Sequence, residues 1–333
     1  MQLLCGDIGG TKTLLQHVVV AANRVEVLTE QRFPSADYPS FDLILEQFLS
    51  QHDASGVAAA CFGVAGPVVH TDSGHTAAIT NLPWQMDSAG LARRFKLPRV
   101  ALINDFEAVG HGIDALPESD FVSLQGGEPL AQGNRLVVGA GTGLGVAQMV
   151  WGEGGYRVMP SEGGHADFAP GDTMQLKLAE HIMRKHGRCS VEFVLSGPGL
   201  MNIFTALAEM KQLLDSLDYQ RIRQAADPAA AIATAADQDS ASLAGAAMAL
   251  FVKIYGGQCG NYALACLPRG GVFVAGGIAA KIIQQLRQGD FMAAFNAKGK
   301  MAQLMQRMPV NVITNPGVGL IGTRVYAERL ATD

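Results

Sequence analysis

The residue pair Asn104-Asp105 follows an apolar run, an arrangement that delivers an amide and a carboxylate to the end of a buried strand. Residues 100–103 predict that strand, and the segment after Asp105 is compatible with a helix. Open α/β sheets bind their ligands at such strand ends. The dipole of the following helix favours an ionised Asp105, which is the form that acts as a base. From this segment alone, a plain helix cap formed by Asn104 or Asp105 is an equally good interpretation.

A glycine-rich turn near the N-terminus has the composition of a phosphate-binding loop. The run Asp7-Ile8-Gly9-Gly10-Thr11 is followed by β-rich residues 14–20 rather than by a helix. It is therefore neither a Walker A loop, which needs Gly-Lys-Ser/Thr, nor a Rossmann fingerprint, which opens a helix. Successive amides in such a turn form a nest that binds anions, so we expect it to hold phosphate. A simple glycine hairpin is the alternative.

A second glycine turn, in the other half of the chain, repeats the first. Residues 135–147 predict a strand, the turn Gly139-Ala140-Gly141-Thr142-Gly143 and another strand. A repeat of this kind indicates two related α/β lobes with a ligand held between their opposed hairpins. Two such hairpins can hold one polyphosphate from both sides, whereas either hairpin alone is weak evidence for phosphate binding.

A carboxylate and an imidazole lie three residues apart in the run Glu162-Gly163-Gly164-His165. With Asp167 they are metal-ligand types, but the Cys-rich spacing and the fourth ligand of a structural zinc site are missing. We favour recognition of sugar hydroxyls, because hydroxyls need clustered hydrogen-bond donors and acceptors. A purely structural turn is the remaining alternative. Glu192, which precedes an apolar stretch, is either another hydroxyl ligand or part of the acidic first turn of a helix.

A further apolar run ends in paired glycines. Residues 271–275 predict a buried strand, which Gly276-Gly277 and a helix follow. Such a pair lets a flat aromatic ring or a phosphate approach the backbone closely. Near the C-terminus, residues 315–322 begin a closing helix that we expect to pack on the N-terminal lobe.

The elements around these motifs predict an α/β protein. Three strands, with turns at the first glycine run and near Asn23-Arg24, precede alternating helices and strands in the order βββαβαβ. The expected helices cover residues 40–52 and 88–95. Between them, a buried strand begins at Val57 and breaks at Gly66-Pro67.

Length and composition fit a globular protein of two domains. The chain has 333 residues, of which 48% are apolar and 17% charged, and a chain of this length usually forms more than one core. A net charge of −5 without a basic run gives no electrostatic footprint for nucleic acid. No apolar run reaches the roughly 18 residues of a membrane span, and no signal peptide is apparent. We expect a cytoplasmic protein with neither a nucleic-acid nor a membrane partner.

The five cysteines are scattered, odd in number and mostly within apolar runs. This pattern favours buried thiols in a reducing compartment over a disulfide framework.

The ordered set of motifs resembles the bacterial ATP-dependent glucokinases of the hexokinase–actin–Hsp70 superfamily. The resemblance runs nearly end to end, and it includes Leu195-Ser196-Gly197-Pro198-Gly199-Leu200 and Asn315-Pro316-Gly317 besides the motifs above. No single motif is diagnostic, but the set in this order is very specific. The related ROK sugar kinases carry a cysteine-rich zinc loop after the His motif. Only Cys189 lies in that region here, so the chain looks like the zinc-free glucokinase branch.

The resemblance implies two ribonuclease H-like lobes of the actin-like ATPase type with a ligand cleft between them. Residues 1–115 and 312–333 would form a small α/β lobe, and residues 116–311 a large α/β lobe. The implied activity is phosphorylation of the 6-hydroxyl of glucose by Mg-ATP, the first step of glycolysis, and the implied assembly is a homodimer. A kinase for another hexose and a catalytically inactive sugar-sensing regulator remain alternatives, as do polyphosphate or ADP as the phosphoryl donor.

Matching positions also imply roles for individual residues. Asp105 would be the general base, and Asp7 would reach Mg²⁺ through water. Four side chains would bind the other sugar hydroxyls: Asn104, Glu162, His165 and Glu192. The contacts to ATP would come from Asp7, Gly9, Gly10, Thr11, Gly141, Thr142, Gly143, Gly276 and Gly277. Lys12 is often a different residue in this family, so we assign it no role.

Overall fold

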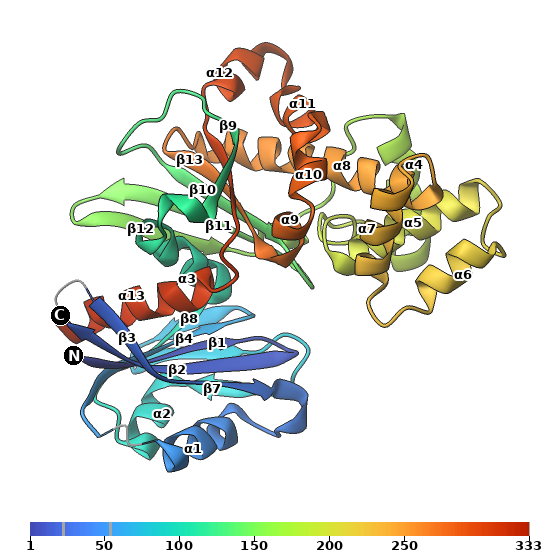
Figure 1. Cartoon of the computed structure of the whole chain (residues 1–333). Coiled ribbons are helices and arrows are strands. Elements are labelled where there is room, and N and C mark those ends of the chain that lie inside the picture. Colours follow the sequence, from blue (N-terminus) through green and yellow to red (C-terminus); the bar gives the residue numbers. More distant parts are fainter. Residues whose placement is uncertain (22–23, 53–54, 333) are drawn as a thin grey trace. The chain divides into compact units, whose positions relative to one another are not determined.

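The computed structural model describes residues 1–21, 24–52 and 55–332, and its contacts divide the chain into two compact units (Figure 1). Unit 1 comprises Met1–Pro117, Val158–Pro160 and Gly317–Asp333, and unit 2 comprises Glu118–Arg157 and Ser161–Pro316. The turn predicted near Asn23-Arg24 falls on Asn23, which lies outside the described residues. The lobe boundaries predicted from the sequence remain a prediction, although residues 310–313 form a strand in the sheet of unit 2.

Unit 1 is built on a five-stranded sheet in the order β3-β2-β1-β4-β8. Its strands are β1 (Gln2–Ile8), β2 (Lys12–Ala21), β3 (Arg24–Pro34), β4 (Val57–Val64) and β8 (Val100–Asn104). The first three pair antiparallel, whereas β1, β4 and β8 run parallel. Ile8 pairs with Val64 and Val64 with Asn104, so the three parallel strands end at the same edge of the sheet.

Helices cover both faces of this sheet, as the almost continuous burial of β1, β4 and β8 requires. On one face, Leu4 and Phe62 pack with α1 (Phe41–Gln51) and α2 (Ser88–Phe95). On the other, Leu3 and Cys61 pack with α3 (Asp105–Gly112) and the C-terminal helix α13 (Val318–Thr332), which is red in Figure 1. The predicted order βββαβαβ and the predicted packing of the closing helix on the N-terminal lobe are confirmed.

A small three-stranded sheet in unit 1 did not follow from the sequence. It consists of β5 (Val68–Thr71), β6 (Gly74–Ala78) and β7 (Gln85–Asp87), all antiparallel. Its strands are short and mostly exposed, so they lack the apolar run that marks a core strand. Short 3₁₀ turns complete the unit: Ser35–Asp37 and Ile113–Ala115.

Unit 2 repeats this topology in a six-stranded sheet of order β12-β11-β10-β13-β14-β9. The strands are β9 (Phe121–Gln125), β10 (Arg135–Ala140), β11 (Leu144–Gly152), β12 (Gly155–Ser161), β13 (Gly271–Ala275) and β14 (Val310–Ile313). The antiparallel hairpin β10–β11 leads to the parallel strands β13 and β14, as β1–β2 leads to β4 and β8. The internal repeat predicted from the two glycine turns is therefore confirmed as a repeat of sheet topology.

Unit 2 contains one long apolar helix, α8 (Leu243–Cys266), which has 24 residues and is buried along most of its length. The other helices are α4 (Thr173–His186), α5 (Gly197–Met210), α6 (Leu217–Arg223), α7 (Pro228–Gln238), α9 (Gly276–Lys281), α10 (Ile283–Arg287), α11 (Asp290–Asn296) and α12 (Ala302–Gln306). Short 3₁₀ turns lie at Glu118–Asp120, Gly163–His165 and Gly299–Met301.

Within the described residues, no helix has by itself the length and apolar composition of a membrane span. The pair α7 and α8, bent by 106° where they meet, passes that test only when the two are taken together. All five cysteines are buried free thiols, as the sequence predicted.

Candidate active site

Asn104 caps the helix that follows it. Its Oδ1 accepts the N–H of Phe106 at 2.9 Å and that of Glu107 at 3.3 Å, and the Glu107 carboxylate accepts the Asn104 N–H in return. Asn104 Nδ2 donates to the carbonyl oxygen of Gly66 at 3.2 Å. The capping interpretation is thus confirmed, and binding of a sugar hydroxyl by the second hydrogen of this amide stays a prediction.

Asp105 is the first residue of α3 and is half-buried. Its Oδ1 accepts the N–H of Phe106 at 2.9 Å. The positive end of the helix dipole favours the carboxylate form at this position. The structure therefore places Asp105 as the sequence predicted, at the end of β8 and the start of a helix, and its role as a base is untested.

The first glycine turn connects β1 to β2 and is held by hydrogen bonds. Gly9 N donates to Lys12 O at 2.9 Å, and Ser35 Oγ donates to Gly9 O at 2.8 Å. The backbone N–H of Ser35 also donates to Thr11 O at 3.2 Å. A Cβ on Gly10 would lie 3.1 Å from the carbonyl oxygen of Thr80, so the turn packs closely there. Sequence reasoning missed Ser35, because nothing in its neighbourhood marks a contact with a turn so far back in the chain.

Asp7 lies one residue before the end of β1, at the same sheet edge as Asn104. It is half-buried, and burial raises the pKa of its carboxyl while the charge of Lys12 lowers it. Mg²⁺ is usually held by one or two carboxylates together with substrate phosphates and water. A single carboxylate beside a glycine turn fits that pattern, so Asp7 is suited to the predicted water-mediated contact.

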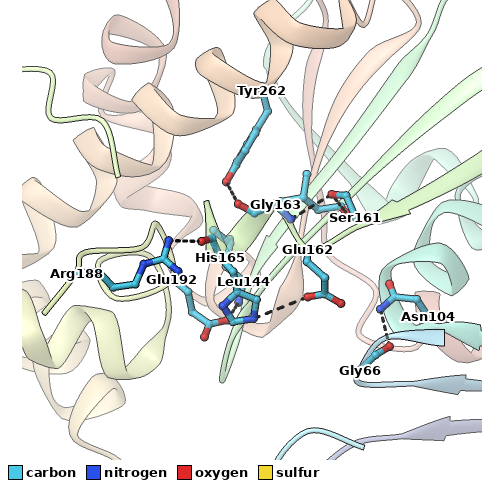
Figure 2. A network of polar contacts seen from close by, with 11 residues as sticks. Gly66, Asn104, Leu144, Ser161, Glu162, Gly163, His165, Arg188, Glu192 and Tyr262 are labelled. Carbon is cyan, nitrogen blue, oxygen red and sulfur yellow. Dashed lines mark hydrogen bonds and ion pairs between the residues drawn. The ribbon is translucent and has the colours of Figure 1, made fainter. Parts of the chain in front are cut away.

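In unit 2, Glu162 precedes the 3₁₀ turn Gly163–His165 and His165 ends it, and the two side chains lie close together. Glu162 Oε2 lies 3.8 Å from His165 Nε2, and both side chains are more than half exposed (Figure 2). Arg188 donates to the carbonyl oxygen of His165 at 2.9 Å and pairs with Asp167 at 2.6 Å. Among the described residues, no three His, Cys, Asp or Glu side chains are grouped closely enough to hold a metal ion, so the metal interpretation gains no support.

Glu192 joins this turn to the second glycine turn. Its Oε2 accepts the N–H of Leu144 at 2.8 Å (Figure 2). Its own N–H donates to Gly164 O at 2.9 Å. A Cβ on Gly143 would lie 2.6 Å from the Glu192 carboxylate, and one on Gly164 would lie 2.2 Å from the carbonyl oxygen of Leu144. At Gly164 the neighbour is backbone, so only glycine allows this close packing. Glu192 precedes α5, which begins at Gly197, so the first-turn interpretation is wrong.

The motifs of unit 2 that the sequence predicts to bind nucleotide also lie together. Gly141, Thr142 and Gly143 form the turn between β10 and β11, where Gly141 N donates to Gly143 O at 2.8 Å. Gly276, at the end of β13, has φ +84°, and a Cβ there would lie 2.5 Å from the carbonyl oxygen of Ala140. The structure therefore brings the Gly276-Gly277 pair alongside the strand end that leads into the glycine turn.

Comparison with known proteins identifies the family. The glucokinase family model matches residues 4–330 of the chain. The glucokinase of Trichormus variabilis is 40% identical over 343 residues, which cover 98% of this chain and 99% of the relative. The chain belongs to the glucokinase family. The resemblance found in the motifs is thereby confirmed, and with it the prediction that the chain is an enzyme of the glucokinase type.

Solved structures support the fold of this glucokinase-family chain. The crystal structure of glucokinase from an Antarctic psychrotroph has a TM-score of 0.82 and 28% identity and covers 98% of this chain and 99% of its own. A ROK family glucokinase from Streptomyces griseus, in complex with glucose and AMPPNP, has a TM-score of 0.66. Its identity is 19% over 99% of this chain and 100% of its own, so this likeness concerns the fold alone. The predicted actin-like ATPase fold is confirmed.

Proposed function

We propose that the chain transfers the γ-phosphoryl group of ATP to the 6-hydroxyl of glucose, which gives glucose 6-phosphate and ADP. The proposal rests on the family and on one observation, the hydrogen bond between the Glu192 carboxylate and the N–H of Leu144. This bond fixes a cluster suited to sugar hydroxyls against a turn suited to phosphate. Such an arrangement serves a sugar kinase, because phosphoryl transfer depends mainly on the positioning of donor and acceptor.

On the sugar side, the proposed ligands combine both kinds of hydrogen-bonding group. Glu162 and Glu192 accept hydrogen bonds from hydroxyls, and His165 donates or accepts according to its tautomer. Asn104 would add its second amide hydrogen. The ROK family glucokinase from Streptomyces griseus was crystallised with glucose and AMPPNP, so the fold that it shares with this chain can hold both kinds of ligand.

On the nucleotide side, the amides of the two glycine turns would face the phosphate oxygens. Gly9, Gly10 and Thr11 belong to one turn and Gly141, Thr142 and Gly143 to the other, and Gly276-Gly277 would face adenosine. Mg²⁺, held through water by Asp7, would neutralise part of the phosphate charge. Backbone amides in fixed positions stabilise developing charge without reorganisation at the moment of reaction.

Asp105 would act as the general base. Its carboxylate would accept the proton of the 6-hydroxyl as the oxygen of that hydroxyl bonds to the γ-phosphorus. The bond from the γ-phosphorus to the bridging oxygen of the β-phosphate breaks in the same step, and ADP leaves. The transition state of phosphoryl transfer is loose, so the proton moves late and an ordinary aspartate suffices. Glucose 6-phosphate is the product of the first step of glycolysis, and we place the enzyme there, in the cytoplasm and as a homodimer.

A panel of sugars tests the proposal. We would measure turnover with Mg-ATP and glucose, mannose, fructose or N-acetylglucosamine, in the wild type and in Glu162→Gln. Glucose should have the highest kcat/KM, and Glu162→Gln should raise the KM for glucose roughly tenfold or more, because the lost hydrogen bond involves a charged group. Glu153→Gln, an exposed carboxylate in the same unit, is the control and should change neither value.

Two outcomes would overturn it. A higher kcat/KM for another sugar would make the chain a kinase for that hexose. Binding of glucose without phosphorylation of any sugar would make it a sensor that keeps the fold without the reaction.

A further inference from the structure

Helix α8 carries two tyrosines, Tyr255 and Tyr262, seven residues apart. Seven residues make almost two full helical turns, so both side chains leave the same face of the helix. The hydroxyl of each bonds to the backbone of a segment to which the proposed function gives a substrate. Sequence reasoning singled out neither residue, because in sequence both lie far from the segments that they contact.

Tyr255 links the two strand ends from which the nucleotide segments of unit 2 begin. Its buried hydroxyl accepts the N–H of Ala140 at 3.1 Å and donates to the carbonyl oxygen of Ala275 at 3.4 Å. Ala140 directly precedes Gly141, and Ala275 directly precedes Gly276. Burial raises the pKa of Tyr255 well above its ordinary value, so the hydroxyl keeps its proton throughout the working pH range. One side chain thus sets the spacing of both glycine segments.

Tyr262 holds the Glu162–His165 turn, the proposed sugar-binding segment, in the same way. Its hydroxyl donates to the carbonyl oxygen of Gly163 at 2.8 Å, between Glu162 and His165 (Figure 2). Burial raises the pKa of this hydroxyl too, and the nearby Cys259 adds to the effect. Tyr262 therefore remains a donor, and its bond fixes the turn whose two ends carry the carboxylate and the imidazole.

The helix between these tyrosines is itself firmly packed. A Cβ on Gly256 would lie 1.9 Å from the carbonyl oxygen of Phe291, so α8 and α11 touch backbone to backbone. The ring of Tyr255 packs edge-on against Phe251 and Phe291, with centroids 6.0 and 5.6 Å away. Rigid support of this kind allows α8 to act as a common reference for both segments.

We propose that Tyr255 and Tyr262 are positioning residues, and that each of them positions the binding segment for a different substrate. Tyr255 sets the glycine segments that bind the nucleotide, and Tyr262 sets the Glu162–His165 turn that binds the sugar. The inference rests on the proposed function, because that function assigns each segment its substrate. Neither tyrosine contacts a reacting atom in this account, so each acts on binding rather than on the chemical step.

The experiment is a steady-state analysis of Tyr255→Phe and Tyr262→Phe with both substrates varied. Tyr262→Phe should raise the KM for glucose about three- to tenfold, the usual effect of one lost neutral hydrogen bond, and leave the KM for ATP and kcat within about twofold. Tyr255→Phe should raise the KM for ATP by a similar factor and leave the KM for glucose unchanged. Each variant is the matched control of the other, because both lose one hydroxyl from the same helix face.

A third variant controls for the loss of a tyrosine hydroxyl elsewhere in unit 2. Tyr156 donates to the carbonyl oxygen of Gly133 at 2.9 Å, in the segment before β10, and Tyr156→Phe should change neither KM. If Tyr262→Phe leaves the glucose KM unchanged, or raises both KM values equally, the inference is wrong. Should the buried Tyr255 variant fail to fold, Tyr262→Phe decides alone. Failure of the proposed function is separate, because it would appear in the wild type as absent glucose turnover.

Discussion

Asp7 and Glu192 are both assigned to the site, but the fold treats these two carboxylates differently. Glu192 accepts the N–H of Leu144, which compensates for its partial burial. For Asp7, burial raises the pKa of the carboxyl, and the charge of Lys12 offsets this in part. A charged Asp7 therefore costs stability in the ligand-free protein, and a nearby Mg²⁺ would relieve that cost. Local destabilisation of this kind is typical of functional residues.

This difference predicts that Asp7→Asn stabilises the protein and impairs the enzyme. A carboxyl whose pKa is raised by folding stabilises the fold at low pH and loses that contribution as the pH rises through its folded-state pKa. At pH 7 the variant should thus have a higher Tm than the wild type, and the gap should close as the pH falls and Asp7 protonates. Its turnover should fall roughly 10- to 100-fold.

Thermal unfolding between pH 3 and pH 8, with an activity assay at pH 7, measures both effects. A Tm at pH 7 that is equal to or below that of the wild type would contradict this account of Asp7.

Residue roles that depend on neighbours in sequence could be predicted, and roles that depend on distant partners could not. The glycine run at Asp7 and the pair Asn104-Asp105 are visible because strand, turn and side chain are contiguous. Ser35, Tyr255 and Tyr262 act through contacts across many residues, so no local pattern marks them. The sequence identified Glu192 as a candidate carboxylate, but its hydrogen bond to the N–H of Leu144 is visible only in the folded structure.

At the scale of the element, β8 passes directly into α3, since the strand ends at Asn104 and the helix begins at Asp105. The capping box on Asn104 and Glu107 makes this sharp junction possible, because it satisfies amides that the first helical turn leaves without partners. The same junction holds the proposed base at the sheet edge. Capping and sugar binding are therefore not competing interpretations of Asn104, because Oδ1 forms the cap, whereas the proposed sugar contact involves a hydrogen on Nδ2.

Two substitutions separate the helix-capping role of Asn104 from its proposed sugar-binding role. Asn104→Ala removes both the cap and the amide and should lower the free energy of unfolding by about 1–2 kcal/mol. Asn104→Ser restores a capping oxygen and should recover part of that loss. Both variants lack the amide hydrogens, so both should raise the KM for glucose. Urea unfolding and steady-state kinetics measure the two effects, and a wild-type glucose KM in Asn104→Ser would show that the amide does not bind the sugar.

At the scale of the whole molecule, the chain forms two units and returns to the first at its end. Helix α13 packs on the sheet of unit 1, where Leu320 joins the apolar cluster that includes Cys5 and Cys61. The sequence predicted this return and the repeated topology, because both follow from apolar runs and glycine turns. It did not predict α8 as a continuous buried helix, because an almost uniformly apolar sequence gives no periodic signal of a face.

The labelling rates of the buried cysteines measure whether the two units open independently. Leu320→Ala leaves a cavity under α13 and should lower the free energy of unfolding of unit 1 by about 2–4 kcal/mol. Burial raises the pKa of Cys5 to about 12, so its thiol reacts only when unit 1 opens. Thiol labelling followed by mass spectrometry should show faster modification of Cys5 and Cys61 and an unchanged rate at Cys259.

Leu207→Ala, a buried leucine of unit 2, is the matched control and should show the opposite pattern. Equal acceleration at all five thiols in either variant would mean that the chain opens as one body, against this prediction.

The most direct test of the account concerns Asp105. We would measure glucose 6-phosphate formation with Mg-ATP in the wild type, in Asp105→Asn and in the control Asp72→Asn, which alters an exposed carboxylate of the same unit. If Asp105 is the general base, kcat should fall by about 10²–10⁴-fold in Asp105→Asn, with the KM for glucose nearly unchanged and with Asp72→Asn like the wild type. Near wild-type turnover in Asp105→Asn would contradict the central claim.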